Sequence, residues 1–171
     1  MDAYLAIASR REVRNYSDRP VPEEVQRRIL EAGRVSGSSA NRQQWRFVWV
    51  TDRGLLVRLA DQVFVPSNVR LSAFAVAIAV SGKGPTSFDA GRAAQNMMLA
   101  AWNEGVGSCP NGMPDRAGAG EVLGLSDGEQ TAIILTFGYP ARPGRDPETR
   151  PAEQWIEAAD RKPFEEIVQR L

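Results

Sequence analysis

The chain has 171 residues, of which 43% are hydrophobic and 25% charged, and this is typical of a single globular domain covering residues 1–171. Its 21 Lys and Arg balance its 21 Asp and Glu, so the zero net charge disfavours nucleic-acid or anionic-membrane partners. Histidine is absent and Cys109 is the single cysteine, which excludes Ser-His-Asp and Cys-His catalysis, His- or Cys-rich metal sites and an internal disulfide.

Targeting signals are not apparent in the sequence. Residues 1–14 carry the acid Asp2 and lack a basic segment followed by a long apolar one, so they do not match a signal peptide. The most apolar stretch, residues 71–80, is shorter than the roughly 20 residues that a membrane-spanning helix needs. We therefore expect a cytoplasmic protein without a membrane segment.

Helical and strand patterns follow one another along the chain. Asp2 is a suitable cap for a short helix that ends near Ser9, and Pro22 followed by two acids begins a second helix. Further helices are predicted after Asp52, at residues 88–104 and around 115–123, with strands at 45–50, 74–80 and 131–137. This mixture predicts an α+β fold, with a long exposed loop at residues 139–151.

The predicted helix at 88–104 has a broad face of small residues. Ala90, Ala93, Ala94 and Ala101 lie on this face together with two methionines, and Gly105 ends the helix. A face of this kind lets another helix approach closely. The helix is therefore expected in the core or in a dimer interface.

Three arginines, Arg10, Arg11 and Arg14, follow the first helix. The planar guanidinium group binds phosphate through two parallel hydrogen bonds, so such a cluster can form a phosphate clamp. The alternative is a solvated helix end in which Glu12 pairs with a neighbouring arginine.

A second polar cluster lies between the second helix and the first strand. Ser38, Ser39, Asn41 and Gln43 offer hydroxyl and amide groups that can bind the edge of a heteroaromatic ring or a polyol chain. The alternative is a turn that leads into the strand.

The third candidate is the segment at residues 105–112, which we predict to be a flexible loop. Its glycines would let backbone N–H groups approach a ligand closely. It is not a dinucleotide-binding fingerprint, because Pro110 stands where that pattern needs glycine. Cys109 in this segment is expected to be a buried packing residue rather than a redox thiol.

Taken in order, these segments resemble the FMN-dependent nitroreductase family. The matching motifs are Arg10-Arg11-Glu12-Val13-Arg14-Asn15-Tyr16, the helix start from Val21, residues 37–47, residues 88–108, Gly138, and Arg161-Lys162-Pro163-Phe164. The resemblance covers nearly the whole chain. It implies a three-layer α/β/α sandwich around a central mixed, mainly antiparallel sheet, in an intertwined homodimer.

The resemblance also implies FMN bound at the dimer interface, with NADH or NADPH as electron donor and a flat acceptor such as a nitroaromatic compound or a quinone, in a ping-pong reaction. Arg10 and Arg161 would hold the phosphate, supported by Arg11, and Arg14 would lie near the pyrimidine end of the flavin. The partner subunit would contribute Ser38, Ser39, Asn41 and Gln43.

In the same family pattern, the backbone of Pro110, Asn111 and Gly112 would face the ring, with an N–H of Asn111 or Gly112 near N5, the atom that receives hydride. No side chain would be catalytic and no metal is expected, because the flavin carries the redox chemistry. Asn68 is a further candidate contact at the pyrimidine edge.

The sequence departs from the family pattern at several positions. Glu12 replaces the usual serine, so a carboxylate near the phosphate would weaken FMN binding unless it turns toward Arg11 or Arg14. Gly37 and Gln44 replace common prolines, and residues 62–71 leave little room for a helix that usually roofs the substrate pocket. Two alternatives are therefore another flavin chemistry on the same fold, such as dehalogenation, dehydrogenation or flavin breakdown, or a non-enzymatic dimeric module that has lost FMN.

Overall fold

A computed structural model describes residues 1–142, 144 and 146–171, and it forms two compact units that we consider separately. The larger unit is Arg11–Pro143 and the smaller combines Met1–Arg10 with Gly144–Leu171. Two residues of the predicted loop at 139–151, Pro143 and Arg145, lie outside the described residues.

The larger unit is built on a four-stranded sheet with strand order β1-β2-β4-β3. The strands are β1 (Trp45–Val50), β2 (Phe74–Ser81), β3 (Gly107–Asn111) and β4 (Glu129–Gly138). Neighbouring strands are antiparallel, with Phe47 opposite Ile78 and Cys109 opposite Thr136. Glu12, which lies outside these strands, forms an isolated parallel bridge with Ser108 of β3.

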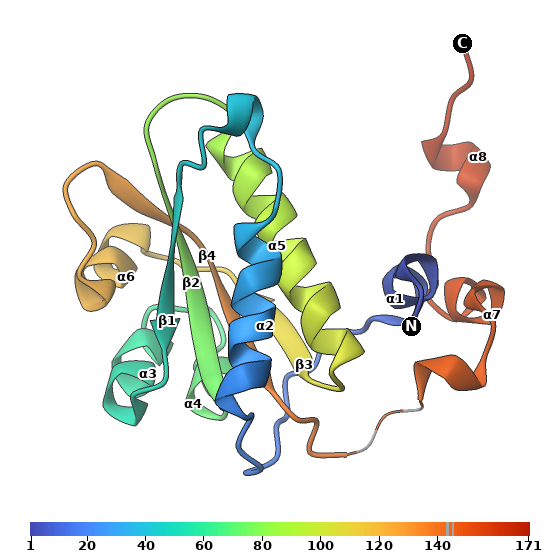
Figure 1. The fold of residues 1–171 in the computed structure, drawn as a ribbon, viewed down its shortest axis with the longest axis horizontal. Helices are drawn as coiled ribbons and strands as arrows, with labels where there is room; N and C mark the ends of the chain where they lie inside the picture. The colour runs from blue at the N-terminus through green and yellow to red at the C-terminus, as the bar shows by residue number, and fades with distance from the viewer. Residues whose placement is uncertain (143, 145) are drawn as a thin grey trace. The chain divides into compact units, whose positions relative to one another are not determined.

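Two helices, α2 (Glu23–Arg34) and α5 (Thr86–Asn103), cover one face of this sheet (Figure 1). Ile29 and Met97 are fully buried between these helices and the larger side chains of β2 and β4, which include the stacked rings of Phe74 and Phe137. Gly33 lets α2 approach α5, because a Cβ there would lie 2.0 Å from Met97 Cε.

The other face carries α3 (Arg53–Ala60), α4 (Pro66–Arg70) and α6 (Arg116–Leu123) (Figure 1). Ala75 and Ala77 of β2 point to this side and pack in one cluster with Leu56, Leu59 and Ala119. The two clusters enclose the sheet between helical layers, which confirms the predicted three-layer α+β architecture.

The smaller unit contains α1 (Ala3–Ser9), the 3-10 turn η2 (Pro147–Thr149), α7 (Ala152–Glu157) and α8 (Phe164–Ile167). Asp2 caps α1 as predicted, its Oδ1 accepting a hydrogen bond from the Leu5 N–H at 2.9 Å. Helix α1 packs against α7 and η2, and Trp155 is buried there, its Nε1–H donating to the Pro147 carbonyl at 3.0 Å. The end of this unit exposes Phe164, Ile167 and Leu171.

The predicted strands and the longer predicted helices are confirmed, with ends that differ by a few residues. The flexible loop predicted at residues 105–112 is wrong, because residues 107–111 form β3. Its glycine and proline suggested a loop, but β3 is an edge strand, where a proline is tolerated. The sequence also gave no prediction of α4, η2, α7 or α8. Among the described residues, no helix is long and apolar enough to cross a membrane.

Candidate functional site

The segment that carries Arg14 lies along the edge strand β3. The Val13 N–H donates to the Ser108 carbonyl at 3.0 Å, and Glu12 bridges the same residue through the backbone. Gly107 makes this approach possible, since a Cβ at that position would lie 2.6 Å from Val13 Cβ. The contact brings Arg14 to the rim of a pocket at the end of β3.

That pocket has a volume of about 140 Å³ and is lined by Arg14, Phe64, Val65, Asn68, Cys109, Pro110, Asn111 and Gly112. The Phe64 N–H donates to the Gly112 carbonyl at 3.1 Å, and Phe64 as a residue is 69% exposed. A Cβ added to Gly112 would lie 3.2 Å from Phe64 Cδ2. The pocket thus combines the aromatic side chain of Phe64, the backbone at Gly112, which has no side chain, the amide of Asn68 and the positive charge of Arg14.

A buried hydrogen-bond network supports the floor of the pocket. The Asn68 Nδ2 donates to Asn111 Oδ1 at 2.9 Å, and the Asn111 Nδ2 donates to the Cys109 carbonyl at 2.9 Å. Thr136 Oγ1 accepts from the same nitrogen at 3.2 Å and lies 3.0 Å from the Tyr16 hydroxyl. The side chain of Asn111 is therefore held in the protein interior, and the residue also lines the pocket.

Tyr16 and Cys109 are two buried members of this network. Burial raises the pKa of the Tyr16 phenol well above its usual value, so the hydroxyl stays protonated and can donate. Cys109 is 1% exposed, which confirms that it is buried. Its Sγ donates to the Pro110 carbonyl at 3.4 Å and accepts from the Asn68 Nδ2 at 3.8 Å.

The second predicted cluster forms a tight turn beside the start of α5 (Figure 1). Asn41 and Gln43 have left-handed φ angles of 52° and 51°, and Ser38 Oγ accepts from the Gln43 N–H at 2.9 Å. Asp89 Oδ2 accepts from the Ser39 N–H at 3.0 Å. Within one chain, this turn does not contribute to the pocket at the end of β3.

The predicted phosphate-binding arginines are divided between the two units. Arg10 caps the C-terminal end of α1, and Arg161 follows α7, both in the smaller unit. Arg11 and Arg14 belong to the larger unit, at the start of the segment that runs along β3.

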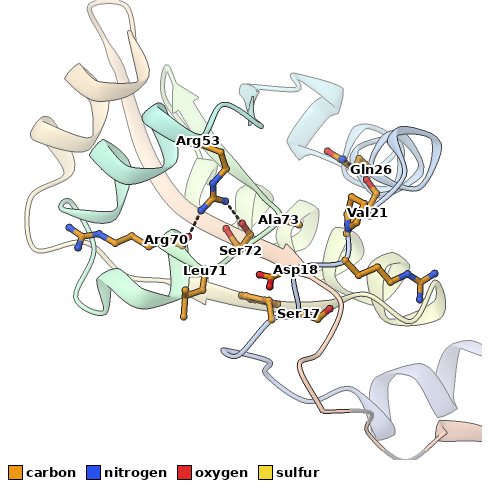
Figure 2. A pocket seen from close by; sticks show the side chains of 12 residues that line it. Ser17, Asp18, Val21, Gln26, Arg53, Arg70, Leu71, Ser72 and Ala73 are labelled. Carbon is orange, nitrogen blue, oxygen red and sulfur yellow. Dashed lines mark hydrogen bonds between the residues drawn. The ribbon is translucent and has the colours of Figure 1, made fainter.

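A larger hollow of about 420 Å³ lies elsewhere in the larger unit and contains none of the predicted site residues (Figure 2). Its arginines are bound to the protein. Arg53 donates to the Ser72 carbonyl at 2.6 Å and to the Arg70 carbonyl, and Arg70 pairs with Asp61. Arg19 lies over the Tyr139 ring, 4.0 Å from its centre. Because Arg53 and Arg70 already bind groups of the protein, this hollow is less suited to an anion than its three arginines would suggest.

Sequence reasoning missed several residues that shape the pocket and the turn. Asp89 could have been noticed, because it is an acid on a helix face that otherwise consists of alanines and methionines. Phe64 and Thr136 gave no comparable signal, since their roles depend on segments that are distant in the sequence.

Comparisons with known proteins identify relatives of this chain. The family model described as the nitroreductase family matches residues 7–77 and 80–139. A protein of Methanothermobacter thermautotrophicus named "Putative NADH dehydrogenase/NAD(P)H nitroreductase" is 29% identical over 91% of this chain and 88% of its own.

Solved structures also match. A structure from Desulfovibrio desulfuricans, titled as a "putative nitroreductase in complex with fmn", has a TM-score of 0.84 and 26% identity, covering 100% of this chain and 98% of its own. A nitroreductase family protein of Clostridium difficile 630 shares the fold, with a TM-score of 0.82 at 23% identity over 99% of this chain and 98% of its own.

Proposed function

Because this chain belongs to the nitroreductase family, we propose that it is an FMN-dependent oxidoreductase that uses NADH or NADPH to reduce a flat acceptor. The pocket at the end of β3 carries the proposal, since its wall and edges suit a planar heteroaromatic ring. The names of its relatives support FMN as cofactor, a nicotinamide donor and a nitro compound as acceptor. A quinone is a further flat acceptor that the proposal includes.

The residues present fit a flavin in chemical character. An isoalloxazine ring has apolar faces and a polar edge, and the pocket offers the Phe64 ring beside the bare backbone of Gly112, with the amide of Asn68 at its side. Any side chain at position 112 would crowd Phe64 and fill this space. When bound, FMN supplies the transfer of hydride equivalents from a nicotinamide to the acceptor.

The chain's own residues would bind and orient the cofactor. The main chain of Pro110, Asn111 and Gly112 would face the ring, and Arg14 would stabilise the negative charge of its reduced form. The buried network beneath β3 keeps this backbone in place. Arg10, Arg11 and Arg161 are the proposed phosphate ligands, on the strength of the motif resemblance.

We also propose a homodimer. The turn with Ser38, Ser39, Asn41 and Gln43 is absent from the pocket of its own chain, which is expected if it serves the pocket of a partner. Exposed apolar side chains on α8 and at the terminus, together with Phe88 on α5, would be covered in such an assembly. The C-terminal tail is the proposed segment that crosses to the partner.

An absorption spectrum tests the proposal directly. The purified protein, given FMN and freed of excess, should keep a flavin spectrum, and NADH or NADPH should bleach it in the absence of oxygen. Retained flavin that neither nicotinamide reduces would indicate a different flavin chemistry. A colourless protein that takes up no FMN would contradict the proposal, and recovery of binding in Glu12→Ser would then identify Glu12 as the cause.

A further inference from the structure

We propose that Asn111 is a positioning residue that fixes the side-chain amide of Asn68, so that the pocket presents a carbonyl acceptor to a bound ring. The site then selects a ring edge that carries an N–H donor. The inference rests on the proposed function, since it concerns the ring that this pocket would hold.

The orientation of the Asn111 amide follows from its neighbours. Its Nδ2 lies 2.9 Å from the Cys109 carbonyl oxygen and 3.2 Å from that of Ile134. Carbonyl oxygens can only accept hydrogen bonds, so the nitrogen and not the oxygen of the amide must face them. Thr136 Oγ1 is a third partner at 3.2 Å, and Asn111 is only 4% exposed. A reversed amide would place its oxygen against two carbonyl oxygens, with no hydrogen between them.

The orientation of Asn68 follows in turn. The Asn111 Oδ1 is left facing Asn68, and it lies 2.9 Å from the Asn68 Nδ2. Cys109 Sγ lies 3.8 Å from the same nitrogen, so both of its hydrogens point into the protein. The Asn68 Oδ1 makes no hydrogen bond with the described residues, and Asn68 lines the pocket. This oxygen is therefore the group that the amide offers to a ligand.

A fixed acceptor distinguishes between ring edges. An N–H opposite the Asn68 Oδ1 would gain a hydrogen bond without any rotation of the amide, whereas a carbonyl or an alkylated nitrogen would leave a nearly buried acceptor unpaired. The imide N3–H of a flavin has the required donor. In this arrangement Asn68 touches the ring, and Asn111 acts only through Asn68.

Affinity measurements separate these roles. We would titrate the protein with FMN and with N3-methyl-FMN, which lacks the N–H, and follow flavin fluorescence for the parent, Asn68→Leu, Asn111→Leu and the double variant. The exposed Asn103→Leu on α5 is the matched control. The parent and the control should prefer FMN by about tenfold, and each single variant should lose most of this preference. The double variant should lose no more than either single variant, because the two residues act as one unit.

The outcomes distinguish the two proposals. If the parent binds no FMN, the proposed function fails and this assignment fails with it. If the parent binds FMN and Asn111→Leu keeps the full preference, Asn111 does not orient Asn68 and only this assignment is overturned. A preference that survives in Asn68→Leu would show a steric cause and would also overturn it.

A second measurement needs no substitution. In the unsubstituted protein, the side-chain NH2 hydrogens of both Asn68 and Asn111 should exchange slowly with solvent, and FMN should leave the Asn111 signal in place. Rapid exchange of the Asn68 hydrogens would show that its nitrogen faces the pocket, which would overturn the assignment even if the variants fail to fold.

Discussion

Val13 and Gly107 lie so close together that a Cβ on Gly107 would be 2.6 Å from Val13 Cβ. Gly107→Ala should therefore push the Arg11–Val13 segment away from β3. We expect the free energy of unfolding to fall by about 1–3 kcal/mol, as for other overpacked sites, and FMN to bind more weakly. Gly120→Ala in α6, where the nearest atom would be 3.6 Å away, is the control and should be neutral or stabilising. Urea unfolding and FMN titration of both variants would check this, and equal stability would contradict it.

Arg14 is predicted to tune the bound flavin through its charge. Removing it in Arg14→Gln should lower the midpoint potential of bound FMN by on the order of 10–30 mV, because the reduced ring loses a stabilising cation. Arg14→Lys, which keeps the charge, should change the potential less. Spectroscopic redox titration would measure both, and an unchanged potential in Arg14→Gln would place this arginine away from the ring.

Asp89 should act on flavin binding through the turn at Ser39. Asp89→Leu leaves the Ser39 N–H without its acceptor, which costs about 1–3 kcal/mol, so the turn should loosen. Amide hydrogen exchange at Ser39 should become faster and FMN affinity should fall. Asp89→Asn keeps an oxygen acceptor and serves as the control. If Ser39 stays protected in Asp89→Leu, the turn does not depend on this carboxylate.

Because the pKa of Tyr16 is raised, we expect the stability of the fold to depend on pH in the alkaline range. A group whose pKa is higher in the folded than in the unfolded protein stabilises the fold below its unfolded pKa, near 10, and this stability is lost as pH rises further. Tyr16→Phe should cost about 0.5–1.5 kcal/mol at neutral pH, for the lost hydrogen bonds with Thr136. Above pH 10 the gap between parent and variant should narrow. Urea unfolding at several pH values would measure the gap, and a constant gap would refute the buried phenol.

Glu129 should make the stability of the fold depend on pH in the acidic range. Its hydrogen bonds with Arg46, and then with the Ser126 N–H, lower its pKa from 4.5 to about 2. A lowered pKa stabilises the fold above the unfolded value, and this contribution is lost as pH falls from about 4.5 through about 2. Glu129→Gln should therefore lower the melting temperature slightly at neutral pH, with the difference vanishing near pH 2. Glu121→Gln, on the exposed surface of α6, should melt as the parent does.

Local patterns were sufficient to predict most of the fold. The strand at 74–80 and the helix at 88–104 have clear hydrophobic patterns, and Asp2, Asp52 and Asp115 cap the helices that they were expected to begin. The strand β3 was missed because its glycine and proline contradict local strand propensity, and its formation depends on pairing with β4.

In the candidate site, too, some residues could be predicted from local motifs and others could not. Arg14 and residues 110–112 were found from motifs, and the structure places them around one pocket. The assigned role of Asn111 was limited to its backbone, because the partners of its side chain, Ile134 and Thr136, lie on a strand more than twenty positions away in the sequence. Such contacts leave no local pattern from which they could be read.

The segment that lies along β3 also shields an edge of the sheet. An open edge strand can pair with a strand of another molecule and so begin aggregation. Here Glu12 and Val13 pair with the backbone of Ser108, and Pro110 has no backbone N–H that could donate to another strand. The residues that lead to Arg14 therefore also protect the folded chain from edge-to-edge association, so a variant that detaches them should lose solubility as well as affinity for the proposed cofactor.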